Sequence, residues 1–282
     1  MKASSKTGLV CVRRRFVAGL LNTACVLWPA LGVSCFPLNA TEPAMVFIPA
    51  GDFLRGRSHA LPDDNLKWFP TLMRDDRPVR RMFVDAFYLD EHEVTNEQYA
   101  VFVKATGHRT PYHWTKGQVP QGKEKFPVVN VSWDDATRFA RWAGKRLPTE
   151  AEWERACRGL AEGKKYSWGD RAPTKDDARF NRVDGPTEVC RFRPNDFGLC
   201  DMACSAWEWC ADWYEKDYYQ TAADRNPRGP EKGLYRVLRG GSWADVAKYL
   251  TCAYRSWARA AERSPNIGFR CAKSFPRTAG SR

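Results

Sequence analysis

Two short runs near the C-terminal end constrain the fold of this chain most: RVLRGGSW at Arg236–Trp243 and NIGFRCA at Asn266–Ala272. In the first run, a strand-like stretch is followed by two glycines, which favour a tight turn, and then by a tryptophan. The two runs frame residues 244–265, a segment with a single cysteine, Cys252. The functional prediction depends mainly on this segment.

The composition is that of a globular protein with many turns. The 282 residues are 43% hydrophobic and include 18 prolines and 20 glycines, which are scattered along the chain. Such a length suits one large domain or two small ones. Because there is no internal repeat, low-complexity run or interdomain linker, we expect one α+β, loop-rich domain over residues 41–282.

Several local patterns predict regular elements. Capping residues followed by apolar faces at helical spacing favour helices that begin after Thr95, Ser132 and Thr149. Residues 45–57 are expected to form two strands around a turn at Ala50-Gly51, and residues 80–95 to contain a half-buried strand. Beyond residue 159 the pattern is irregular, so helices are not expected there.

Residues 1–40 have the pattern of an export signal. Three arginines, Arg13 to Arg15, precede the apolar stretch Phe16–Cys35, which ends near Ala40. The arginines resemble a twin-arginine signal, and an ordinary secretory signal is the alternative. The apolar stretch is short and interrupted, so a stable membrane span is not expected. These features predict a periplasmic protein.

The charge distribution argues against a nucleic-acid partner. The formal charge is +12, but five of the basic residues lie within residues 1–40, and the others alternate with acids. Seven of the ten cysteines follow residue 40, and outside the cytoplasm such thiols tend to pair. Seven is odd, so at least one is expected to stay outside a disulfide.

Several blocks in order resemble the formylglycine-generating-enzyme (sulfatase-modifying factor) family. They are MVFIPAGDFLRG, DEHEVTNEQYAVFV, FPVVNVSWDDATRFARWAGKRLPTEAEWERACRG, YSWGD, PNDFGLCDM, WEWCADWY, RVLRGGSW and NIGFRCA. The resemblance covers nearly all of the chain beyond residue 40. It implies a single mixed α/β domain related to the C-type-lectin-like topology.

The resemblance fails at the catalytic segment. Oxidases of the family carry two cysteines five positions apart there, and their thiolates hold copper(I), which suits soft sulfur ligands. Here the second position is Trp257, so a copper pair cannot form within the segment. Cys210 is an alternative partner for Cys252, either near a metal or in a disulfide. We keep Cys252 as a candidate catalytic residue.

The resemblance also implies structural features. It aligns Cys157 and Cys271 with a family disulfide, and it suggests a structural calcium site that involves Asn181, Asp184 and Glu208. The chain has Cys204-Ser205 where the family has Gly-Asn, which weakens that calcium site. One further disulfide is expected among Cys190, Cys200 and Cys204, with the pairing left open.

The segment supplies candidates for substrate binding and acid–base chemistry. Glu262 is the candidate base, provided that burial raises its pKa. The remaining candidates are proposed to bind a flat or anionic substrate, or alternatively to be core or surface residues: Trp243, Tyr254, Arg255, Trp257 and Arg259.

Three functions remain open. Within the family, the missing thiol and the export signal resemble the branch that matures pyoverdine siderophores, which implies periplasmic oxidation of dihydropyoverdine with molecular oxygen as a candidate acceptor. The partner is then a small peptide siderophore precursor. The alternatives are a copper-dependent formylglycine-generating oxidase of sulfatases and a non-catalytic binding protein on the same fold. The sequence leaves the oligomeric state open.

Overall fold

The computed structural model describes residues 44–60 and 75–276. The predicted export signal lies outside the described residues. The strands are β1 (Met45–Ile48), β2 (Gly51–Arg55), β3 (Arg80–Val84), β4 (Phe87–Asp90), β5 (Trp207–Trp213), β6 (Arg236–Arg239), β7 (Ser256–Ala258), β8 (Ile267–Gly268) and β9 (Ala272–Ser274). The helices are α1 (Asn96–Thr106), α2 (Trp133–Trp142), α3 (Glu150–Arg158) and the single turn α4 (Tyr218–Thr221).

The three predicted helix starts are confirmed. Thr95, Ser132 and Thr149 each accept a hydrogen bond from the backbone of the third helical residue, whose side chain bonds back to the cap. These capping boxes satisfy backbone N–H groups that the first helical turn leaves without partners. Short sequence patterns therefore position three helices in a chain that is otherwise rich in loops.

The first four strands form two consecutive antiparallel pairs. β1 pairs with β4 and β2 pairs with β3, with Met45 opposite Asp90 and Gly51 opposite Val84. β1 and β2 therefore do not pair with each other, and the predicted turn at Ala50-Gly51 is wrong, because Gly51 is the first residue of β2. Pro49, in the short connection between them, has no N–H to donate to a ladder, and the chain runs on in the same direction with the same register.

A four-stranded sheet carries the segment of interest. Its order is β7-β6-β5-β8, in which β5 and β8 are parallel and the other pairs are antiparallel. Residues 244–265 leave the end of β6, supply β7, and return to β8. In this topology the segment's strand β7 pairs with β6, and β6 pairs in turn with β5, the strand that contains the Trp-Glu-Trp run.

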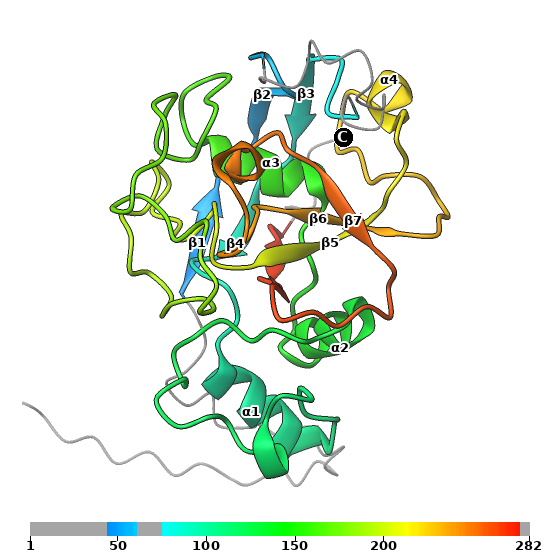
Figure 1. Cartoon of the computed structure of the whole chain (residues 1–282). Coiled ribbons are helices and arrows are strands. Elements are labelled where there is room, and N and C mark those ends of the chain that lie inside the picture. Colours follow the sequence, from blue (N-terminus) through cyan, green and yellow to red (C-terminus); the bar gives the residue numbers. More distant parts are fainter. Residues whose placement is uncertain (1–43, 61–74, 277–282) are drawn as a thin grey trace, which may run out of the picture. The chain divides into compact units, whose positions relative to one another are not determined.

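Helix α3 lies near the centre of the described structure (Figure 1) and packs against β2, β3, β5 and β6. Its inward residues, including Trp153 and Cys157, belong to one of the apolar clusters of the core. The predicted single, loop-rich mixed α/β domain is confirmed. Within residues 44–60 and 75–276, no helix is long and apolar enough to cross a membrane.

Candidate functional site

The backbone of residues 244–265 is fastened at several points. It forms a 3₁₀ turn at Ala247–Leu250 and then β7. The N–H of Cys252 donates to the carbonyl of Lys165 at 2.9 Å, and Arg239 donates to the Cys252 carbonyl at 2.9 Å. The segment is thus tied to distant parts of the chain rather than forming a loose loop.

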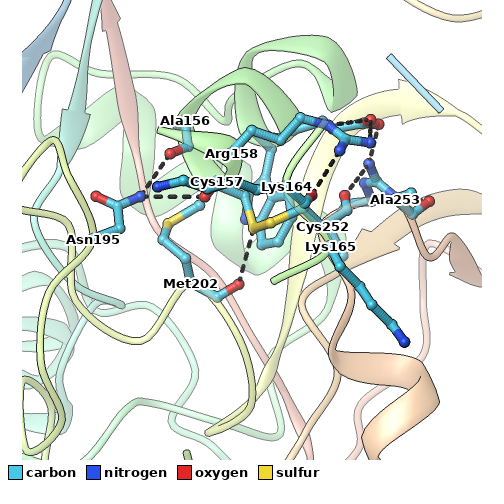
Figure 2. Close-up of a disulfide and its surroundings, with 12 residues drawn as sticks. Ala156, Cys157, Arg158, Lys164, Lys165, Asn195, Met202, Cys252 and Ala253 are labelled. Carbon is cyan, nitrogen blue, oxygen red and sulfur yellow. Dashed lines mark hydrogen bonds and ion pairs between the residues drawn. A yellow bond between two sulfur atoms is a disulfide. The ribbon is translucent and has the colours of Figure 1, made fainter. Parts of the chain in front are cut away.

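The strongest tie is a disulfide between Cys157 of α3 and Cys252, with a Cα–Cα distance of 5.7 Å (Figure 2). The predicted pairing of Cys157 with Cys271 is therefore wrong. Cys157 and Cys252 share one apolar cluster, whereas Cys271 belongs to another and donates its backbone N–H to Asp90. Cys190 and Cys200 form a second disulfide, which resolves the pairing that the sequence left open.

The disulfide changes the role available to Cys252. Its sulfur is bonded to that of Cys157, so this residue offers no thiol as a nucleophile, base or copper ligand. Cys204 and Cys210 lie in neither disulfide, and burial raises the pKa of both thiols well above the usual range. They are therefore held in the neutral form, which is a weak metal ligand.

Arg255 is an internal ion-pair residue rather than a surface anion anchor. It is fully buried, and its Nε lies 2.6 Å from Oε1 of Glu150 while Nη2 lies 3.2 Å from Oε2. Arg55 also pairs with Glu150, at 2.7 Å. Since the charge of Arg255 is already compensated, the predicted substrate-binding role is corrected to a structural one.

Trp257 is paired with a residue that the sequence did not single out. Its ring stacks on Tyr214, with centroids 4.3 Å apart and planes 19° apart. The Tyr214 hydroxyl donates to Oδ2 of Asp75 at 2.7 Å. Burial raises the pKa of Asp75 to about 6, although the nearby Arg255 opposes this shift.

The other predicted aromatic residues lie in different contacts. Tyr254 packs edge-on against Tyr249 at 4.7 Å and lies 6.1 Å from the Trp207 ring. Trp243 directs its indole N–H toward the carbonyl of Pro265 at 3.4 Å. The predicted aromatic residues therefore do not form one surface, because Trp257 stacks on Tyr214 while Tyr254 packs against Tyr249 and Trp207.

The two acids of the segment differ in environment. Glu262 is exposed, as is Arg259, whose carbonyl accepts the Glu262 backbone N–H. The burial on which the predicted base role of Glu262 depended is absent. Asp245 is half-buried and accepts hydrogen bonds from the N–H and hydroxyl of Ser242, at 2.9 and 2.5 Å. Asp245 thus fastens the turn after the two glycines.

A group of buried carboxylates surrounds Arg270. Glu208 accepts two hydrogen bonds from this guanidinium, both at 2.8 Å. Glu93 lies 4.0 Å from Arg270, and neither of its buried oxygens has a hydrogen-bond partner. Oδ1 of Asp201 also lacks a partner, and burial raises the pKa of Asp201 to about 6. One arginine therefore faces three acids.

Comparison with known proteins identifies the family. Residues 34–275 match the sulfatase-modifying factor enzyme 1-like domain. The formylglycine-generating enzyme of Streptomyces coelicolor is 35% identical over 317 residues, which cover 90% of this chain and 98% of that enzyme. The chain belongs to the sulfatase-modifying factor family.

Two further proteins are similar to the chain. It is 38% identical over 246 residues to the serine/threonine-protein kinase pkn1 of Chlamydia caviae, but it spans only 38% of that protein's length. Among solved structures, PvdO from Pseudomonas aeruginosa is 27% identical, with a TM-score of 0.68 over 83% of this chain and 95% of that one. The fold of the sulfatase-modifying factor family thus extends over the described domain.

The calcium ligands predicted from the family do not come together. Asp184 is exposed and pairs with Arg179 at 2.8 Å, whereas Glu208 is buried against Arg270. Asn181 is exposed, and its backbone N–H donates to Asp245. In the part of the chain that the structure describes, one group of acidic, cysteine or histidine ligand atoms lies within 4.8 Å, but two of its members are the disulfide-bonded Cys190 and Cys200.

Proposed function

We propose that this chain catalyses the periplasmic oxidation of dihydropyoverdine to pyoverdine without a copper–thiolate centre. The bond between Cys157 and Cys252 carries the proposal, because it removes the one thiol of the segment from metal chemistry. The likeness to PvdO supports the choice of reaction. Two disulfides suit an oxidising compartment, and the arginine-rich start of the chain suits export to it.

The reaction removes two hydrogens from a saturated ring bond of the chromophore. One leaves as a proton, and the other leaves as a proton with two electrons. Molecular oxygen takes the two electrons and both protons and becomes hydrogen peroxide. A new double bond forms in the ring, which extends its conjugation and generates fluorescence.

The test uses the purified full-length protein with dihydropyoverdine in air. The expected result is a product lighter by two hydrogens, together with the fluorescence of pyoverdine. Oxidation of a cysteine in a sulfatase peptide would instead support the formylglycine-generating alternative. Tight binding with no change in siderophore mass would support the binding-protein alternative, and either result would overturn the proposal.

A further inference from the structure

The stacked pair of Tyr214 and Trp257 joins two strands of the functional sheet. Tyr214 directly follows β5, and Trp257 is the middle residue of β7. Both side chains are half-buried, and their rings are nearly parallel. A half-buried Tyr–Trp pair offers a rigid flat surface for a planar ring system, together with two polar groups, the phenol hydroxyl and the indole N–H.

Behind the phenol lies a buried carboxylate with a fixed orientation. Asp75 is only 6% exposed, and its Oδ2 accepts the Tyr214 hydroxyl at 2.7 Å. Arg255 lies 3.8 Å from the same oxygen and donates to the Asp75 carbonyl at 2.9 Å. Because Glu150 holds Arg255 in place, the guanidinium of Arg255 stays beside the Asp75 carboxylate.

We propose that Tyr214 is the catalytic residue that takes the proton in the oxidation, with Asp75 as its positioning carboxylate and Trp257 as the surface for the planar ring. The inference rests on the proposed function and adds residues to it. In this proposal Tyr214 replaces the exposed Glu262 as the base.

Tyr214 and Asp75 carry the proton from the substrate to reduced oxygen. The substrate gives a proton to the phenol oxygen of Tyr214 while the phenol gives its own proton to Oδ2 of Asp75. The remaining hydrogen, with two electrons, passes to molecular oxygen and forms the hydroperoxide anion. The proton held by Asp75 returns through Tyr214 to this anion, which gives hydrogen peroxide and restores both residues.

The acid–base properties of Asp75 agree with this role. The charged and titratable groups around it are Arg255, Tyr214, Asp76 and Glu150. Burial has the largest effect and raises the pKa of Asp75 to about 6. A carboxylate whose pKa lies closer to neutrality is better suited to accept and return a proton than an ordinary exposed acid.

The experiment compares Tyr214→Phe and Asp75→Asn with wild type in the full-length protein. Tyr214→Phe keeps the ring that stacks on Trp257, so KM should change little while kcat falls by at least about 100-fold. In wild type, kcat/KM should rise with pH through about 6 as Asp75 ionises, and this rise should be absent in Asp75→Asn. Urea midpoints of all variants verify folding.

Two matched controls are available. Tyr88→Phe removes a hydroxyl from a stacked tyrosine on β4, and Glu262→Gln removes the exposed carboxylate of the segment. Both should keep wild-type kinetics. Wild-type kcat in Tyr214→Phe, or an unchanged pH profile in Asp75→Asn, overturns the inference while the proposed function stands. If wild type itself leaves dihydropyoverdine unchanged, the proposed function fails instead.

Discussion

The sulfur atoms of Cys157 and Cys252 form a buried bond that joins α3 to the segment between β6 and β8. The resemblance to the family implies that its oxidases carry their copper-binding thiols in the corresponding segment. Here the same region uses its cysteine for cross-linking. The pairing of Cys252 with Cys157 therefore leaves no free thiol in this segment.

The long disulfide should stabilise the protein more than the short one. Removing Cys157–Cys252, which closes a 95-residue separation, is expected to cost about 5 kcal/mol, against about 3 kcal/mol for the 10-residue Cys190–Cys200 link. Urea unfolding of the double alanine variants of each pair measures both values. A larger loss from Cys190–Cys200 would contradict the chain-entropy argument.

Glu150→Gln should destabilise the fold severely. The substitution leaves Arg55 and Arg255 buried without their shared carboxylate, which typically costs about 3–5 kcal/mol. Glu262→Gln, at an exposed position, should stay within about 0.5 kcal/mol of wild type. Equal urea midpoints for the two variants would show that the ion pairs of Glu150 do not contribute this much to the free energy of unfolding.

Stability should fall as the pH rises toward neutrality because of Asp212. Burial raises the pKa of this carboxyl from 3.8 to about 7, so between these values the folded state binds more protons than the unfolded state. Its contribution to the free energy of unfolding therefore decreases with pH, with a slope of up to about 1.4 kcal/mol per pH unit.

Asp212→Asn tests this effect, because its amide oxygen can still accept the N–H of Glu150. The variant should lose less stability than wild type between about pH 4 and about pH 7 in urea unfolding. An identical pH dependence in both proteins would exclude Asp212 as the source.

Local and long-range features differed in how far the sequence could predict them. Capping residues such as Thr149 act within one helical turn, so the helix starts were predictable. The partner of Cys157 depends on which core cluster each cysteine enters, and spacing along the chain does not determine this. A family alignment transferred the usual partner, Cys271, to a chain that uses another.

The same limitation applies to Tyr214 and Asp75, whose contact the sequence does not predict. Asp75 falls in the polar stretch at residues 65–78, whose composition is typical of a surface loop, and it is 139 residues from Tyr214. Nothing in either neighbourhood signals the contact. Asp201, one of the acids around Arg270, lies in the PNDFGLCDM block, which is part of the resemblance to the family. The composition of this block does not show that Asp201 is buried.

The most direct test of the central claim is mass spectrometry of peptides from the non-reduced protein, with copper measured on the same sample. The account predicts a linked peptide pair that contains Cys157 and Cys252, and no copper that depends on Cys252. A Cys157–Cys271 link, together with one bound copper that is lost in Cys252→Ser, would contradict it.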